Sequence, residues 1–346
     1  MLQEAASAQT AARGTASSRG SDRCALGGPG AIVSTTTRSF PPPSGRQFEI
    51  RTGSYRAIVA EVGATLRAFA KGDADVIDGF SIDDRAAGGR GQVLAPWPNR
   101  LGDGQYTFGG RTGRAPLNEP ERSNAIHGLV RWLQWQAVDH QADRVTLSST
   151  LPPQPAYPWR LQLEITYELD ASGLTVLTTA TNHTDVTAPF GIGFHPYLTV
   201  GTPTVDTARL LLPAARRLVT DRRGLPTGVV GVAGTEFDFS RSRPIGPLQL
   251  DTAYADLDRT ADDQAIVQVA SPDEREVVTL WLDGTYRYVM AFTGDTLEPG
   301  RRRRAIALEP MTCPPDALRS GTDLIRLAPG ATWSGRWGLA VTSGAP

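Results

Sequence analysis

The chain has 346 residues, 35 basic and 36 acidic side chains, and a formal net charge of −1. Because proteins that bind nucleic acid need a surplus of positive charge, this balance argues against a nucleic-acid partner. No stretch of about 18 apolar residues is present, so the sequence predicts no membrane-spanning helix. The two cysteines, Cys24 and Cys313, match neither a disulfide framework nor a metal-binding spacing, and we expect a soluble, cytoplasmic protein.

The N-terminal segment differs in composition from the rest of the chain. Residues 1–44 are rich in Ala, Ser, Thr, Gly and Arg, and they lack the apolar stretch of a signal peptide. Such a composition cannot form a hydrophobic core, so we predict a disordered tail over 1–44. Residues 45–346 are predicted to form one domain, with ordered structure beginning near Gln47.

Alternation of apolar and polar residues dominates the predicted domain, and this period is typical of β-strands with one buried face. Residues 161–169 and 174–182 both alternate and are joined by the turn sequence DASG, which predicts a hairpin. Similar runs occupy residues 144–150, 208–212, 265–270, 276–282 and 287–292. No long segment shows helical spacing, and 36 glycines and 26 prolines suit many short strands. We predict an all-β fold, a large antiparallel β-sandwich.

The first candidate functional residues lie in LAPWPNR, where Asn99 and Arg100 follow a tryptophan between two prolines. The segment is too irregular for the interior of a strand, and a stiff loop can orient a side chain. Arg100 could bind a ligand or form a salt bridge that fixes the loop.

His127, in NAIHGLVRW, is the first candidate histidine. The following Gly128 indicates a sharp turn or a close approach of another backbone segment. Trp132 and Trp135 offer broad apolar faces that can stack on sugar rings. The alternative for all three side chains is an ordinary place in the core.

His195, in GFHPYL, is the second candidate. Pro196 favours extended backbone at the histidine, and aromatic residues flank it. A histidine held at a strand end, with an ordinary pKa near ~6.5, suits a proton donor. By contrast, His140 and His183 lie in polar segments typical of turns, and we assign them no role.

Glu309 follows an apolar run predicted to be a buried strand, which Pro310 is predicted to end. Partial burial there would raise its pKa and make it a usable base, whereas the alternative is a surface glutamate. Asp251 and Asp256 in LDTAYADL are weaker candidates, because aspartate is common in turns. The arginine run 301–304 is predicted to be a solvated turn between two strands, with a phosphate site as the alternative.

These stretches occur in a characteristic order: PNR followed by GQYTFGG, then NAIHGLVR, GFHPYL, LDTAY, LEPMTCPPDAL and LAPG. In this order the chain resembles the aldose 1-epimerase (galactose mutarotase) family from about residue 48 to about residue 342. The resemblance implies a galactose mutarotase-like supersandwich with a sugar cleft across one sheet. It also implies interconversion of the α and β anomers of an aldose by pyranose ring opening and reclosure.

The resemblance also implies roles for individual residues. Glu309 would take the proton of the C1 hydroxyl, His195 would protonate the ring oxygen, and His127 would hydrogen-bond the sugar near that oxygen. The residues that would hold other hydroxyls are Arg100 and Asp251, assisted by Asn99, with Asp256 as a competitor for the role of Asp251.

An acid and a base acting on one sugar suffice for this chemistry, so we expect neither a metal nor another cofactor. The expected partner is a small-molecule aldose, and the expected assembly is a monomer or homodimer. Three alternatives stay open at this point. They are a hexose-phosphate mutarotase using Arg131 and the arginine run, a catalytically silent sugar-binding protein, and a glycoside hydrolase, which would need two carboxylates.

Overall fold

The computed structural model describes residues 40–343. Regular structure there is almost entirely β, and every pairing between named strands is antiparallel. The helical segments are short: η1 (Pro120–Arg122) and α1 (Ala317–Ser320). No helix in this part of the chain is long and apolar enough to cross a membrane. The predicted all-β antiparallel fold is confirmed.

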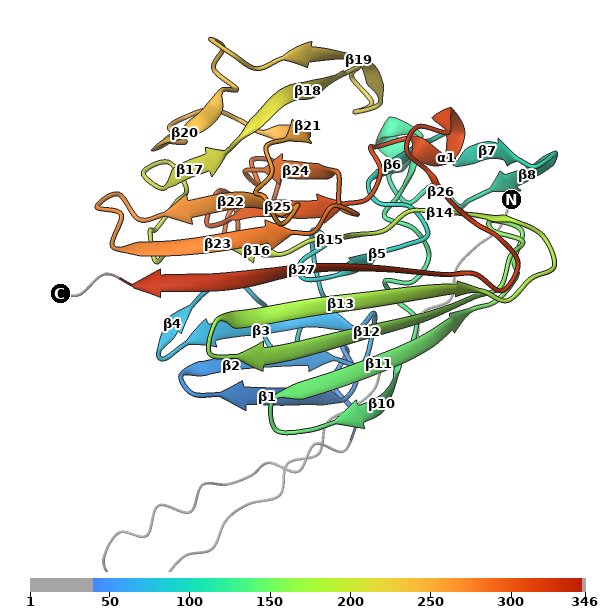
Figure 1. The fold of residues 1–346 in the computed structure, drawn as a ribbon, viewed down its shortest axis with the longest axis horizontal. Helices are drawn as coiled ribbons and strands as arrows, with labels where there is room; N and C mark the ends of the chain where they lie inside the picture. The colour runs from blue at the N-terminus through green and yellow to red at the C-terminus, as the bar shows by residue number, and fades with distance from the viewer. Residues whose placement is uncertain (1–39, 344–346) are drawn as a thin grey trace, which may run out of the picture. The chain divides into compact units, whose positions relative to one another are not determined.

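A nine-stranded sheet crosses the foreground of Figure 1, with β27 through its middle. In spatial order its strands are β10 (Gln136–His140), β11 (Arg144–Leu151), β12 (Leu161–Asp170), β13 (Gly173–Asn182), β27 (Thr332–Ser343), β23 (Glu276–Leu282), β22 (Ala265–Ala270), β17 (Arg209–Leu212) and β20 (Phe239–Pro244).

An eight-stranded sheet carries Asp251 and Glu309, and its strands β5, β15 and β25 lie behind β27 and β23 in Figure 1. Its order is β19 (Pro226–Gly231), β18 (Ala214–Thr220), β21 (Asp251–Leu257), β24 (Tyr288–Phe292), β25 (Ile306–Met311), β15 (Gly193–Phe194) and β5 (Val93–Leu94), and β16 (Tyr197–Leu198) also pairs with β25.

The remaining strands form smaller sheets. One has four strands, β1 (Gln47–Thr52), β2 (Tyr55–Ala60), β3 (Thr65–Lys71) and β4 (Ala74–Asp75), and its first two strands contact β11 and β12. Three pairs complete the fold: β6 (Arg100–Gly102) with β9 (Asn124–Ile126), β7 (Gln105–Phe108) with β8 (Arg111–Arg114), and β14 (Ala188–Phe190) with β26 (Ile325–Leu327).

The predicted hairpin is the pair β12–β13, whose register closes at Asp170 opposite Gly173. Alternate side chains of β12 are buried, as the sequence period requires. At Gly173 the backbone has φ +134°, and a Cβ atom would lie 2.1 Å from the carbonyl oxygen of Leu339. Only glycine fits this turn, because β27 passes so close.

Pro310 does not end a strand, so that prediction is wrong. Glu309 and Pro310 both lie inside β25 (Ile306–Met311). On one side of this strand, Leu308 donates its N–H to Pro196 and Thr312 donates to Ile192. Successive N–H groups of a strand alternate in direction, so an N–H at position 310 would point to the same side as those of Leu308 and Thr312. On that side the partner of β25 changes from β16 to β15, and proline at this position therefore costs no ladder hydrogen bond.

Most of the predicted tail, residues 1–39 with Cys24, lies outside the described residues. The first strand, β1, begins at Gln47. The boundary between tail and domain at residue 44 therefore stays a prediction.

Candidate active site

A reciprocal backbone contact joins the first two candidate segments. The Asn99 N–H donates to Nδ1 of His127 at 3.2 Å, and the His127 N–H donates to the Asn99 carbonyl at 2.9 Å. The Asn99 side chain accepts the N–H of Arg100 at 2.9 Å. The neighbouring strands β6 and β9 pair Arg100 with Ile126. Asn99 and His127, which are 28 positions apart in the sequence, are therefore fixed against each other.

The turn at His127 requires unusual backbone geometry. His127 has φ +66° and Gly128 has φ +67°, both in the left-handed region. A Cβ atom on Gly128 would lie 2.0 Å from the carbonyl oxygen of Ala95. The close approach predicted from this glycine is therefore present, and it holds the buried His127 side chain in place.

His195 lies between β15 and β16, and its N–H donates to the Gln92 carbonyl at 3.1 Å. Its ring stacks on Tyr197, with 4.9 Å between centroids, and meets the His127 ring edge-on at 5.4 Å. A Cβ atom on Gly89 would lie 2.4 Å from the His195 ring. Contacts on several sides leave this ring little freedom to rotate.

Glu309 is 2% exposed, and its Oε1 lies 3.3 Å from Nε2 of His195. In β25, Ile306 and Leu308 belong to the main core, so Glu309 projects from the opposite face of the sheet. The register places Glu309 opposite Met290 and Met290 opposite Ala253 in β21. Asp251, two residues before Ala253, therefore lies on the same face as Glu309.

Burial determines the protonation of this cluster. It lowers the pKa of His127 well below its usual value and that of His195 to about 3, and nearby arginines act in the same direction. Burial raises the pKa of Glu309 well above its usual range, helped by Asp251 and opposed by Arg100. These shifts favour a neutral imidazole on His195 and a protonated carboxyl group on Glu309.

Arg100 forms a buried ion-pair network. Its guanidinium lies 3.0 Å from Glu119 and 3.3 Å from Asp251, whose side chain is 40% exposed. Asn124 also donates to Glu119, at 2.8 Å. Sequence reasoning missed Glu119, because nothing in its local sequence marks it as a partner of an arginine 19 residues earlier. Arg100 thus forms the salt bridge that was one of the two predictions for it, and ligand binding by Arg100 stays a prediction.

The structure places the two competing aspartates differently. Asp256 has φ +53° and pairs with the exposed Arg216, at the other end of β21. Among the described residues Asp256 forms no ion pair with Arg100, whereas Asp251 contacts Arg100 and raises the pKa of Glu309. Which aspartate binds a hydroxyl stays a prediction.

Two further predictions need correction. Trp135 is fully buried in the main core and cannot wall a cleft, whereas Trp132 is 54% exposed. The predicted turn at residues 301–304 is present, but it is not simply solvated. Arg301 pairs with Asp78, and Arg303 pairs with Asp206 and Asp295. Arg304 also lies 3.8 Å from Asp78, whereas Arg302 contacts the Leu297 carbonyl at 3.4 Å, so three of the four guanidinium groups pair with a carboxylate.

The histidines given no role lie apart from the cluster. His140 is the last residue of β10 rather than part of a turn, and its ring is hydrogen-bonded to the Glu49 carbonyl at 3.0 Å. His183 directly follows β13.

His127, His195 and Glu309 offer potential ligand atoms that all lie within 4.8 Å of one another, so a metal must be considered. Nδ1 of His127 accepts a backbone N–H, so the neutral ring carries its proton on Nε2 and has no free lone pair there. Nδ1 of His195 has no partner outside its own residue within 40–343, whereas metal-bound histidines usually donate this proton. The donor set suits proton transfer better than metal binding.

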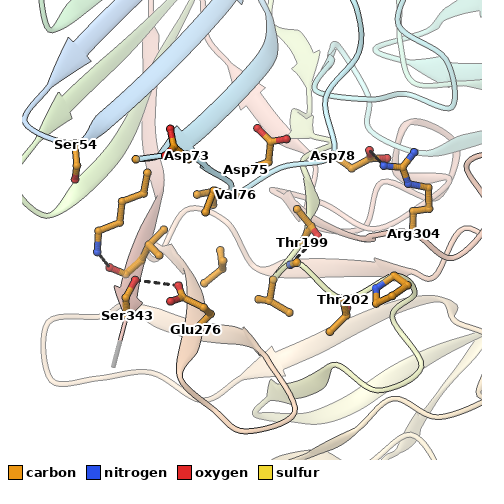
Figure 2. A pocket seen from close by; sticks show the side chains of 18 residues that line it. Ser54, Asp73, Asp75, Val76, Asp78, Thr199, Thr202, Glu276, Arg304 and Ser343 are labelled. Carbon is orange, nitrogen blue, oxygen red and sulfur yellow. Dashed lines mark hydrogen bonds and ion pairs between the residues drawn. The ribbon is translucent and has the colours of Figure 1, made fainter. Parts of the chain in front are cut away.

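A large cavity lies away from the candidate residues. It measures about 880 Å³, and Figure 2 shows Asp73, Asp75 and Asp78 along one side, with Glu276 and Ser343 opposite. None of the six candidate residues lines it. Glu276 accepts a hydrogen bond from Ser343, and Asp78 pairs with Arg304, so these carboxylates are satisfied within the chain. It contains no histidine to pair with a carboxylate.

Comparisons with known proteins identify relatives of this chain. The chain is 33% identical over 288 residues to the uncharacterized protein YihR of Escherichia coli K12, covering 83% of this chain and 90% of YihR. It is 27% identical over 239 residues to the galactose mutarotase of Mus musculus, covering 62% and 68%. A GalM/aldose epimerase homologue from C. elegans has the same fold, with a TM-score of 0.77 at 20% identity over 87% of this chain and 99% of that one.

The sequence model of the aldose 1-epimerase family matches residues 46–339. This match spans both large sheets and all six candidate residues. The chain belongs to the aldose 1-epimerase family.

Proposed function

We propose that the protein is an aldose 1-epimerase that interconverts the α and β anomers of an aldose. The observation that carries this proposal is the buried contact of 3.3 Å between Nε2 of His195 and Oε1 of Glu309. Mutarotation requires one proton to leave the C1 hydroxyl while another reaches the ring oxygen, and a buried acid–base pair can do both.

The protons balance as follows. Glu309 as carboxylate takes the proton of the C1 hydroxyl, the bond between C1 and the ring oxygen breaks, and protonated His195 gives its proton to that oxygen. The products are the open-chain aldehyde, a protonated Glu309 and a neutral His195. After rotation about the C1–C2 bond, the same groups act in reverse and close the ring on the other face of C1.

Burial stabilises the protonation state that accompanies the open-chain sugar. The neutral pair, protonated Glu309 with neutral His195, is the form that the low-polarity site favours, and it is the form present with the open chain. The ionised pair is needed for the closed sugar. The direct contact lets the proton pass between the two groups, and Arg100 favours the Glu309 carboxylate.

His127 has a different role from His195. Because its Nδ1 accepts the Asn99 N–H, its Nε2–H is a fixed donor. Such a donor can bind the ring oxygen or an adjacent hydroxyl without losing its proton. Arg100 and Asp251 supply a donor and an acceptor on the same face of the sheet, suited to hold further hydroxyls, and Asn99 positions both His127 and Arg100.

The alternatives have less support. A glycoside hydrolase would use two carboxylates across one bond, whereas Glu309 is in contact with a histidine. A silent binding protein would have no need of a buried pair whose pKa values are shifted in opposite directions. A phosphate site on the arginine run has less support because Arg301, Arg303 and Arg304 pair with carboxylates of the chain, although Arg302 and Arg131 form no such pair among the described residues.

Polarimetry of freshly dissolved α-D-glucose and α-D-galactose tests the proposal. The protein is expected to accelerate the approach to rotational equilibrium equally with and without EDTA, because the proposed steps use only side chains. Activity that disappears on chelation and returns with a divalent ion would contradict this mechanism.

A further inference from the structure

The strand β19 forms the outer edge of the eight-stranded sheet and is the uppermost strand in Figure 1. Its inner side pairs with β18, and the N–H of Val232 continues this ladder by donating to the Ala215 carbonyl. Because successive residues of a strand alternate in direction, the N–H and C=O groups of Val229 and Gly231 point away from β18. Within residues 40–343 these groups have no backbone partner. One side of β19 is therefore free to pair with another strand.

This edge lacks the charged residues that usually keep an edge strand from pairing with another chain. The strands at the two ends of the nine-stranded sheet do carry charge, because β10 contains Asp139 and β20 contains two arginines. The sequence of β19 is PTGVVG, with Val229 51% and Val230 39% exposed. Its register shifts at the start, next to Pro226, and is regular over residues 228–231. An uncharged, exposed strand of this kind favours pairing.

Val229 lies on the face of the sheet that carries the candidate catalytic glutamate. The register pairs Val229 with Leu218 of β18. Farther along the same sheet it pairs Met290 with Ala253 on one side and with Glu309 on the other. Leu218, Ala253 and Met290 belong to one buried apolar cluster. A strand laid along β19 would cover Val229 and so extend this cluster by burying more apolar surface.

Opposite charges flank β19 and have no partner within the chain. Arg222 lies in the turn before the strand and Glu236 in the loop after it, and both side chains are exposed. Neither side chain forms an ion pair or a hydrogen bond among the described residues, whereas the neighbouring Arg223 pairs with Asp103. Arg222 and Glu236 each lie seven positions from Val229, on opposite sides of it.

We propose that β19 pairs with β19 of a second copy of this chain, antiparallel across a twofold axis at Val229. Such an axis places each residue before Val229 opposite the residue equally far after it in the partner. Arg222 then faces the partner's Glu236, and Glu236 faces the partner's Arg222, so both free charges are compensated. A parallel arrangement would instead place like charges together at each end, which is unfavourable. The uncharged strand between them lets the two copies meet without repulsion.

The resulting homodimer joins the eight-stranded sheets of the two copies into one continuous sheet. Val229 and the partner's Val229 exchange backbone hydrogen bonds, because these groups point outward from the edge. With 6 residues of β19 on each side, the interface is small. Specific interfaces of small area are weak, so we expect a dissociation constant on the order of micromolar. This interface does not depend on the proposed reaction.

Sedimentation velocity of the full chain provides the first test, at concentrations from about 0.1 to 100 µM around the expected Kd. Wild type is expected to shift from the 37.0 kDa monomer toward twice this mass. Val229→Lys places two lysines opposite each other at the axis and should raise the Kd by at least about tenfold. The matched control is Val138→Lys, which changes a 55% exposed valine of the edge strand β10 and should leave the Kd unchanged.

Folding of these variants is checked by thermal unfolding at concentrations where every protein is monomeric. Both valines are exposed, so neither lysine variant should unfold at a clearly lower temperature than wild type. A dimer that persists with unchanged Kd in Val229→Lys overturns the interface. A wild type that stays at 37.0 kDa at the highest concentration overturns the second copy as the occupant of this edge, and the proposed epimerase function stands in either case.

Charge reversal tests the orientation of the two copies. Arg222→Glu and Glu236→Arg should each raise the Kd by on the order of tenfold, because each variant replaces two attractions across the axis by two repulsions. The double variant Arg222→Glu with Glu236→Arg again places opposite charges across the axis, and it should return the Kd close to that of wild type. A double variant that is as weak as the single variants, or weaker, overturns the antiparallel arrangement.

Discussion

The protons of His195 and Glu309 belong to the pair rather than to either residue. Burial displaces their pKa values in opposite directions and so favours the neutral form of each group. Oε2 of Glu309 and Nδ1 of His195 have no partner outside their own residues among the described residues, which is costly unless a ligand completes the site. Both observations favour a polar substrate as the missing hydrogen-bond partner of the pair.

Removal of either group should therefore abolish most of the catalysis. Glu309→Gln and His195→Asn are each expected to reduce kcat by on the order of 10²–10⁴-fold, the usual contribution of general acid–base catalysis. The double variant should lose far less than the product, because the two groups act as one unit. Initial rates of mutarotation measure this, with unfolding curves to confirm that each variant is folded. Near-normal activity of Glu309→Gln, with loss of activity in His140→Asn, would refute the assignment.

At the scale of single residues, short motifs predicted the candidate cluster well. His127, His195 and Glu309 lie in recognisable local sequences, and the structure brings them within 4.8 Å of one another. The partners of the charged residues could not be predicted in this way. Glu119 is close to Arg100 because β6 pairs with β9, and this pairing is a property of the assembled fold.

Among the structural elements, the turn after β9 has the most exacting geometry. Two consecutive residues, His127 and Gly128, adopt left-handed backbone, and the second touches the Ala95 backbone. The turn orients the His127 ring, because the contacts with Asn99 hold both the backbone and Nδ1. Its stability and the geometry of the candidate site are thus coupled.

A comparison of Gly128→Ala with Gly110→Ala separates the cost of backbone strain from the cost of the close contact with Ala95. Both glycines have positive φ, +67° and +76°, but a Cβ on Gly128 would lie 2.0 Å from Ala95 while Gly110 has open space around it. Gly110→Ala should cost about 1 kcal/mol of unfolding free energy from backbone strain alone. Gly128→Ala should cost at least about 2 kcal/mol more, because the backbone must shift, and it should also reduce activity. Urea unfolding curves measure the difference, and equal costs for the two variants would show that the turn tolerates a side chain.

Local sequence period predicted individual strands better than strand ends. The β12–β13 hairpin follows from alternation within one segment and a short turn, which are local signals. The strand end predicted at Pro310 is wrong, although the prediction had a reason: proline has no N–H to donate to a ladder. Here the partner of β25 changes from β16 to β15 at this position, so β25 continues without a hydrogen bond from Pro310. Such a change is visible only when three distant segments are assembled. Likewise, nothing local distinguishes the buried Trp135 from the exposed Trp132.

For the whole molecule, the division between the N-terminal segment and the domain is the feature to test. The family match begins at residue 46, and the compact unit that holds both sheets spans Pro41–Pro346. The composition of residues 1–40 offers few apolar side chains to any core. Folding and the candidate site should therefore depend on residues from Pro41 onward.

A variant that begins at Pro41 is accordingly expected to unfold at the same temperature as the full chain and to keep the same kcat. The matched control is a variant that begins at Gly53, which also removes β1. That strand buries Phe48 and Ile50 and pairs with β2 along its whole length, so its loss exposes apolar surface and leaves the edge of β2 unpaired. The second variant should unfold at a clearly lower temperature or fail to fold, as measured by circular dichroism during heating. If the variant starting at Pro41 is destabilised to a similar degree, residues 1–40 contribute to the domain and the predicted boundary is wrong.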